Sequence, residues 1–129
     1  MVDITPMIPQ GVQVIHGYGD GRFRIGEVSH TGPVLVRPEA TVAWPVEAGV
    51  QIAEIDLDTL APILEAAETY DILLIGSGAR QVFLPPARRA EIREKGPVAE
   101  VMDTGAACRT FNLLLAEGRR VAAALLPVD

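Results

Sequence analysis

Apolar and polar positions follow two different spacings along the chain. Over residues 11–45 the apolar side chains recur at every second position or in short runs, which is the pattern of β-strands. Val12, Val14 and His16 alternate on one face, and Phe23 and Ile25 resume the alternation after a turn at 18–21. The predicted β meander consists of a hairpin ended by Gly26 and the cluster His30–Pro33, followed by short strands over 34–36 and 41–44.

From residue 57 onward the apolar spacing changes to three and four, the period of an α-helix. A helix is predicted over about 58–69, with Asp56 or Asp58 as its N-cap and Pro62 near its first turn. The continuous apolar run 71–75 is typical of a strand buried on both faces. The remaining predicted elements are a charged helix over 85–95, strands over 98–102 and 121–126, and a helix that starts at Asp103 or Thr104 and ends before Gly118.

This order of strand, helix, strand, helix, strand predicts right-handed crossovers and a largely parallel sheet covered by helices. The change of pattern near residue 55 does not mark a domain boundary, because neither half is large enough to bury a core of its own. We therefore predict one compact α/β domain over residues 11–129. A loosely ordered arm, residues 1–10 with Pro6 and Pro9, is predicted to precede it.

Composition and charge exclude several classes of protein. Of the 129 residues, 49% are apolar and 22% are charged, which is typical of a globular chain. The net charge of -6, without a long basic run, argues against nucleic-acid binding. Cys108 has no second cysteine to pair with, and His16 and His30 have no third ligand at a metal spacing. We therefore expect no disulfide, no metal site and no cofactor.

The ends of the chain and its apolar runs bear on its location. Met1 to Pro6 contain neither the basic segment nor the apolar segment of a secretion signal. The longest apolar run, 121–126, is far shorter than the ~20 residues that span a bilayer. These features predict a cytoplasmic protein that does not insert directly into a membrane.

The helix predicted after Asp103 has one apolar face and a first turn of small residues. Ala107, Phe111 and Leu114 share the apolar face, whereas Arg109, Asn112 and Leu113 are predicted to point outward, with Gly105 beneath them. Small residues at 105–107 leave the first backbone amides open to an anion, and Arg109 lies one turn further on. Alternatively, the small residues only let the helix start close to the sheet. The negative charge of Asp103 would then already compensate the positive end of the helix dipole.

Several motifs carry a resemblance to a known family. They are Ile-Gly-Ser-Gly at 75–78, arginine in the next helix, and above all the segment 102–127, MDTGAACRTFNLLLAEGRRVAAALLP. The chain resembles a domain-of-unknown-function family that includes the mitochondrial NADH dehydrogenase (complex I) assembly factor 3 and an adipogenesis-associated domain protein. The match covers most of the chain from about Ile25 and is most specific over 71–127.

The resemblance implies a fold, a role and a type of partner. The implied fold is a compact α/β domain with a mixed central sheet, helices on both sides and an additional N-terminal β layer. The implied role is assembly without established catalysis, in contact with a protein partner such as a subunit of a respiratory or membrane complex. We expect no transit peptide like that of the mitochondrial member, so the organelle is not implied by the resemblance.

Enzymatic interpretations have weaker support from the residues. Gly76-Ser77-Gly78 follows a buried strand, as in dinucleotide-binding proteins, but Gln81 stands where the third glycine belongs and the next helix starts only after Pro85. Cys108 lies in the first turns of a helix beside Arg109, which would activate a thiol, yet its position on the wheel predicts a packed and inert cysteine. Glu91 and Glu94 lie among arginines, which is typical of a solvated ion-pair surface.

A binding surface is the interpretation that remains. The loop Gly76–Arg80 and the turn Asp103–Arg109 both follow the carboxyl ends of strands predicted to be neighbours, and open α/β sheets bind ligands there. The predicted site residues are Gly76, Ser77, Gly78, Arg80, Asp103, Thr104, Gly105, Arg109 and Asn112. We expect a non-catalytic assembly factor with a protein partner and a weak anion or carboxylate site. The alternative is a small-molecule or nucleotide-binding enzyme that uses the same loop and turn.

Overall fold

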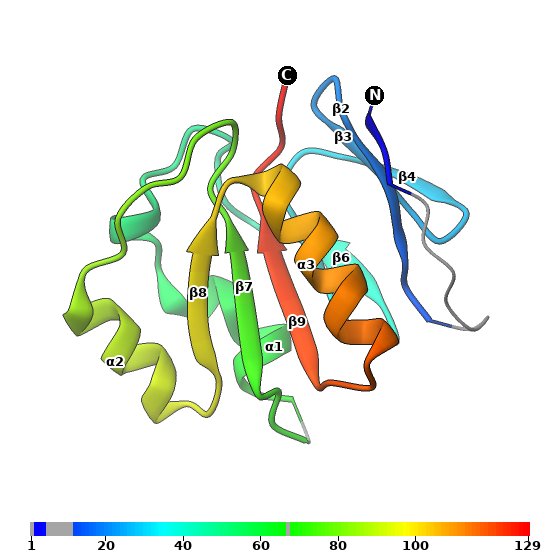
Figure 1. Cartoon of the computed structure of the whole chain (residues 1–129). Coiled ribbons are helices and arrows are strands. Elements are labelled where there is room, and N and C mark those ends of the chain that lie inside the picture. Colours follow the sequence, from blue (N-terminus) through cyan, green and yellow to red (C-terminus); the bar gives the residue numbers. More distant parts are fainter. Residues whose placement is uncertain (1, 5–11, 67) are drawn as a thin grey trace.

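The computed structural model describes residues 2–4, 12–66 and 68–129, and it contains two β-sheets and three α-helices in these segments (Figure 1). The larger sheet has the strand order β6-β5-β9-β7-β8 and forms the centre of the molecule. The smaller sheet has the order β1-β2-β3-β4. Helix α3 and the smaller sheet cover one face of the central sheet, and α1 and α2 cover the other. The predicted α/β fold with an additional N-terminal β layer is confirmed.

The central sheet is parallel in one half and antiparallel in the other. β7 (Ile72–Gly76) lies between β8 (Val98–Met102) and β9 (Val121–Leu125) and pairs with both in parallel. β5 (Val34–Val36) adds to β9 in antiparallel orientation, and β6 (Thr41–Ala43) adds to β5. All five residues of β9 and four of the five residues of β7 are buried, because helices or strands cover both faces.

The smaller sheet is a meander with two tight turns. Its strands are β1 (Val2–Asp3), β2 (Ile15–Gly19), β3 (Arg22–Ile25) and β4 (Val28–Thr31). Asp20 and Gly21 both have positive φ, as a two-residue hairpin turn between right-twisted strands requires. The prediction that His30–Pro33 ends the hairpin is wrong, because His30 and Thr31 continue into the edge strand β4. This strand faces solvent along most of its length, so its sequence lacks a buried alternation.

The predicted alternation of Val12, Val14 and His16 on one face of the first strand is also wrong. Val14 and Ile15 are both buried, whereas His16 is half-buried. The pairing with β3 shifts register between Ile15 and Gly17, which is a β-bulge. A bulge adds one residue to a strand and so interrupts its period of two.

Two apolar cores lie on the two faces of the central sheet. The core on the α3 side joins Phe23 and Ile25 of the smaller sheet to Phe111 of α3 (Thr104–Ala116) and to strand residues such as Leu74. The core on the opposite side contains Trp44, Leu73 and Ile92, the last from α2 (Pro86–Glu94). The smaller sheet therefore shares a core with the central sheet, as expected for one compact domain.

The helix predicted over 58–69 is shorter than expected. Residues 57–60 form a 3-10 turn, Leu57–Leu60, which continues into α1 (Ala61–Leu64), and a separate 3-10 turn spans Ile52–Glu54. Pro62 has no N–H to donate to Asp58, whose carbonyl instead accepts from Ala61 three residues later. Asp56 caps this turn through the backbone N–H of Asp58, as predicted.

The N-terminal arm is described only in part. Val2–Asp3 pairs with β2, and the N–H of Ile4 donates to the carbonyl of His16 at 2.9 Å. The rest of the predicted arm, residue 1 and residues 5–10, lies outside the described residues. In the described segments no helix has the length and apolar character needed to cross a membrane.

Candidate functional site

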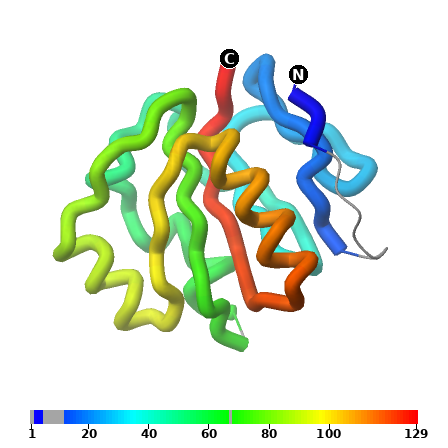
Figure 2. The backbone as a smooth tube through the Cα atoms, in the orientation of Figure 1, coloured from blue at the N-terminus to red at the C-terminus, as the bar shows by residue number. Residues whose placement is uncertain are grey.

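The loop after β7 and the start of α3 lie side by side at the carboxyl end of the central sheet (Figure 2). β7 and β8 are paired neighbours, so the two chain segments that follow them leave the same edge. The amide of Gly78 donates to the Thr104 hydroxyl at 2.8 Å, and the amide of Thr104 donates to the carbonyl of Gly78 at 2.8 Å. The predicted meeting of the loop Gly76–Arg80 with the turn Asp103–Arg109 is confirmed by these bonds.

Thr104 and Gly76 hold this junction closed. The Thr104 hydroxyl also donates to the carbonyl of Leu126 at 2.6 Å, so one buried side chain ties together the loop, the helix and the end of β9. A Cβ at Gly76 would lie 2.8 Å from Leu125 Cδ2 and 3.1 Å from Thr104 Cα. Glycine is needed at 76 because α3 starts in contact with β7.

The backbone amides around the junction are mostly engaged. Asp103 is the N-cap of α3, and its carboxylate accepts from the amide of Ala106 at 2.9 Å. The amide of Ser77 donates to the carbonyl of Met102 at 2.9 Å, and the Ser77 hydroxyl donates to the carbonyl of Arg80 at 2.6 Å. Gly105 is buried beneath the hydroxyl of Tyr18, so it is not the open position expected from the sequence. The contacts favour the alternative in which the small residues serve close packing.

The same contacts give the nucleotide-binding enzyme no support. A dinucleotide site needs glycine amides that face a phosphate and a helix that begins at the glycines. The Gly78 amide is bonded to Thr104, and α2 begins only at Pro86 with Pro85 as its N-cap.

Asn112 does not belong to the exposed surface on which it was predicted. It is 4% exposed, its carbonyl oxygen accepts from the amide of Ile15 at 3.0 Å, and its amide donates to the carbonyl of Ile15 at 2.8 Å. The prediction that Asn112 points outward is wrong, because α3 packs against two sheets and buries a wider face than one sheet would cover. The Asn112 side chain therefore bonds the backbone at the β-bulge of the smaller sheet and is not available to a ligand.

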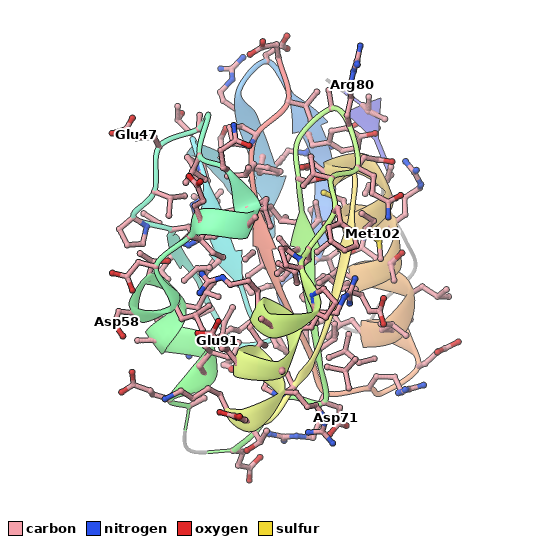
Figure 3. All side chains as sticks on the ribbon, turned by 90° about the vertical axis from the view of Figure 1, so that its left-hand side faces the viewer. Glu47, Asp58, Asp71, Arg80, Glu91 and Met102 are labelled. Carbon is pink, nitrogen blue, oxygen red and sulfur yellow. The ribbon has the colours of Figure 1, made fainter. Side chains whose placement is uncertain are left out.

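The arginines of the predicted site are exposed. Arg80 projects away from the molecule at its upper end, opposite to the end where Asp71 lies (Figure 3). Arg109 lies on α3, with its Nη1 atom 3.5 Å from the hydroxyl of Tyr18. Among the predicted site residues, Arg80 and Arg109 are therefore the cationic side chains that a partner could reach.

Cys108 is packed in the core on the α3 side. It is 0% exposed, and burial raises the pKa of its thiol to about 12, with a smaller opposing effect of Arg109. A thiol with this pKa is protonated at neutral pH and is a poor nucleophile. The prediction of a packed cysteine is confirmed.

An exposed apolar pair between β7 and α2 was not predicted. Phe83 is 76% exposed and Val82 is 41% exposed, whereas Leu84, the next residue, is 1% exposed. Gln81 anchors the segment by donating from Nε2 to the carbonyl of Val101 at 3.1 Å. The sequence signal was present, because Val82 and Phe83 are adjacent apolar residues in a stretch without helical or strand periodicity.

Metal-ligating side chains do not cluster in the described part of the chain. Within it, no group of three or more His, Cys, Asp or Glu side chains is placed to hold a metal ion. Arg80, Arg109, Val82 and Phe83 are exposed in this region.

Comparisons with known proteins identify relatives over nearly the whole chain. An uncharacterized protein of Rhodobacter capsulatus is 41% identical over 118 residues, which cover 92% of this chain and 87% of that protein. The NADH dehydrogenase [ubiquinone] 1 alpha subcomplex assembly factor 3 of Xenopus tropicalis is 36% identical over 113 residues, which cover 88% of this chain and 60% of that protein. The match thus spans less than two thirds of that assembly factor.

Solved structures and a family model agree with these relatives. The crystal structure of a protein from Bordetella parapertussis is 35% identical, with a TM-score of 0.78 and coverage of 92% of this chain and 98% of that one. The family model described as a protein of unknown function, DUF498/DUF598, matches residues 15–126. The chain belongs to the DUF498/DUF598 family of proteins of unknown function.

Proposed function

We propose that this protein is a non-catalytic assembly factor that binds a protein partner through the connection between β7 and α2, residues 77–84. The observation that carries the proposal is the exposure of Phe83 and Val82 in a segment fixed at both ends. Large apolar side chains exposed together on a monomer are typical of interaction sites. The proposal keeps the predicted loop Gly76–Arg80 and extends the site to Phe83.

The contacts of this segment present Phe83 rather than bury it. Upstream, the Ser77 hydroxyl closes the turn onto the carbonyl of Arg80, and Gln81 is bonded to β8. Downstream, Leu84 is inserted into the core beside α2. A segment that is held before binding loses less conformational entropy when a partner docks.

The side chains of this surface suggest the chemistry of the partner. Phe83 fits an apolar pocket, and an aromatic residue centred in such a pocket commonly dominates the binding energy. Arg80 is exposed three residues earlier in the same segment and favours an acidic rim around that pocket. Arg109 on α3 is the other exposed cation through which the predicted weak carboxylate contact would form, without the amides of the helix start.

The relatives support the assembly role and suggest its target. Several matched proteins are called NADH dehydrogenase 1 alpha subcomplex assembly factor 3, with 31–37% identity to this chain. We propose that the partner of this protein is a subunit of a membrane respiratory complex, bound from the cytoplasm before or during its assembly.

Affinity purification from the native cell tests this proposal. Tagged wild type, Phe83→Ser and a matched control, Val28→Ser, are compared by quantitative mass spectrometry, because Val28 is an exposed apolar residue (56%) on the smaller sheet. We expect one or more respiratory subunits to copurify with wild type and with the Val28 variant and to be lost with Phe83→Ser. Equal recovery with all three proteins rejects the surface, and turnover of a metabolite by purified wild type rejects the non-catalytic role.

A deletion strain tests the finer claim about the target. The assembled NADH dehydrogenase in its membranes is measured after complementation with wild type, Phe83→Ser or Val28→Ser. We expect the Phe83 variant to restore less complex than the other two. Normal levels of the complex in the deletion strain contradict a role in its assembly.

A further inference from the structure

A polar groove lies where β5, the loop before β7 and the end of α3 meet, away from the surface around Phe83. It has a volume of about 520 Å³, and its charged and aromatic lining consists of Arg37, Glu39, Glu68, Tyr70, Arg119 and Arg120. Tyr70 precedes Asp71, which Figure 3 places at the end of the molecule opposite to Arg80. The volume is in the range of small-molecule sites, roughly 300–1,000 Å³.

Internal contacts already neutralise part of this charge. Arg120 forms an ion pair with Glu68 at 2.7 Å, donates from Nε to the carbonyl of Thr69 at 2.8 Å, and lies 5.8 Å from the centre of the Tyr70 ring. The hydroxyl of Tyr70 donates to the carboxylate of Glu39. Burial, together with this bond to Glu39, raises the pKa of Tyr70 to about 12, so the phenol stays protonated at neutral pH.

Two guanidinium groups of the lining form no ion pair with any residue in the described segments, although Arg37 also interacts with Tyr70 and acts to lower the pKa of its phenol. The Nε atom of Arg37 is buried, and among the described residues it has no hydrogen-bond acceptor. The side chain of Arg119 forms no ion pair with any residue in the described segments. A buried donor without an acceptor is uncommon in proteins and calls for an explanation, such as a ligand that supplies the acceptor.

The backbone fixes both arginines in place. Arg37 opens a tight turn in which its amide donates to the carbonyl of Ala40 at 2.9 Å and its carbonyl accepts from Ala40 at 3.3 Å. Arg119 follows Gly118, whose φ of 76° ends α3, and its amide donates back to the carbonyl of Leu114 at 2.9 Å. The main-chain positions of both arginines are therefore set without a ligand.

We propose that this groove binds a carboxylate between Arg37 and Arg119. A guanidinium presents parallel N–H donors that match the two oxygens of a carboxylate, which would supply the acceptor that Arg37 lacks. Glu39 and Glu68 border the groove and disfavour a doubly charged phosphate more than a singly charged carboxylate. This site is independent of the partner surface around Phe83.

Arginine-detected NMR tests the site on the full chain. At pH 7 and fixed ionic strength, the Nε–H resonances are followed while acetate is added, with sodium chloride and inorganic phosphate as comparators. A short peptide whose only carboxylate is its C-terminus, and the same peptide as its C-terminal amide, form the second arm. We expect saturable shifts at Arg37 and Arg119 with acetate, the peptide acid or both, and the ligand that binds identifies the source of the carboxylate.

Variants connect the shifts to the two side chains. Arg37→Gln and Arg119→Gln should each weaken binding by about tenfold or more, because each removes a charge-assisted contact. Arg22→Gln removes an exposed arginine of the smaller sheet and should leave binding unchanged. Arg37→Lys covers the case in which the glutamine variant does not fold, since it keeps the charge but lacks Nε and should still weaken binding.

Several results overturn the site. They are the absence of saturable shifts, equal shifts with chloride or with the peptide amide, and unchanged affinity in the Arg37 and Arg119 variants. Tighter binding of phosphate than of either carboxylate rejects the proposed selectivity. Since the Phe83→Ser variant retains the groove, loss of the protein partner in that variant and loss of carboxylate binding here are distinguishable.

Discussion

Asn112 offers a quantitative test of how the smaller sheet is attached to the rest of the domain. Its side chain bonds both the N–H and the C=O of Ile15, at 3.0 and 2.8 Å, and Ile15 is 0% exposed at the β-bulge of β2. Asn112→Ala removes both bonds and leaves two backbone groups without these partners. At about 1–2 kcal/mol for each buried unsatisfied group, the loss is about 2–4 kcal/mol. Alanine recovers ~0.5 kcal/mol through helix propensity, so we expect a net loss of about 1.5–3.5 kcal/mol.

Urea unfolding measures this loss, with Leu113→Ala as the matched control. Leu113 is the next residue of the same helix and is 59% exposed, so its truncation should change the free energy of unfolding by no more than about 0.5 kcal/mol. Amide exchange supplies a local readout, because the Ile15 N–H should exchange faster in Asn112→Ala. A loss below about 1 kcal/mol, or unchanged protection at Ile15, refutes the reasoning.

Three further predictions concern packing and titration. Gly76→Ala should lower the free energy of unfolding by about 1–3 kcal/mol, because the added Cβ meets Thr104. The control Gly49→Ala should not lower it, because there is open space around a Cβ at that position. Equal effects of the two variants in urea unfolding would contradict the close approach of α3. Cys108 should resist alkylation at pH 8 until the protein is unfolded, and Cys108→Ala should cost ~1 kcal/mol; rapid modification of the folded protein would contradict its burial. Tyr70 titrates near 12 when folded and near 10 as a free phenol, so the free energy of unfolding should fall between about pH 10 and pH 12, and this part of the fall should be missing in Tyr70→Phe.

The β-α-β-α-β unit was predictable because each of its elements is specified locally. The run 71–75 is apolar at nearly every position, and α3 has a capping residue at one end and Gly118 at the other. The parallel pairing of β7 with β8 and β9 then follows from the handedness of the crossovers. No comparable rule predicts the strand pairing in the antiparallel half of the central sheet, and that half was expected only from the resemblance.

The errors share a physical cause, which is packing between segments distant in sequence. A helical wheel assumes that a helix has one packing partner, but α3 packs against both sheets. Asn112 and Gly105 are therefore buried, although the wheel placed them outside. β4 was not predicted, because an exposed edge strand has no alternation of buried and exposed residues.

The candidate site was predictable in position but not in character. The order of strands brought the loop Gly76–Arg80 to the turn Asp103–Arg109, as expected. Whether the amides there were open to an anion depended on the hydroxyl of Thr104, whose bonds with Gly78 and Leu126 no sequence pattern reports. The exposure of Phe83 likewise depends on its neighbours Gln81 and Leu84 being anchored.

Site-specific photo-crosslinking in the native cell tests the proposed partner surface most directly. Phe83 is replaced by photo-reactive benzoylphenylalanine, which keeps an aromatic side chain, and Val28 is replaced in the same way as the control position. We expect a discrete crosslinked product at position 83, containing a respiratory-complex subunit, and none containing that subunit at position 28. No crosslink at position 83, or the same product at both positions, would contradict the claim that this surface binds the partner.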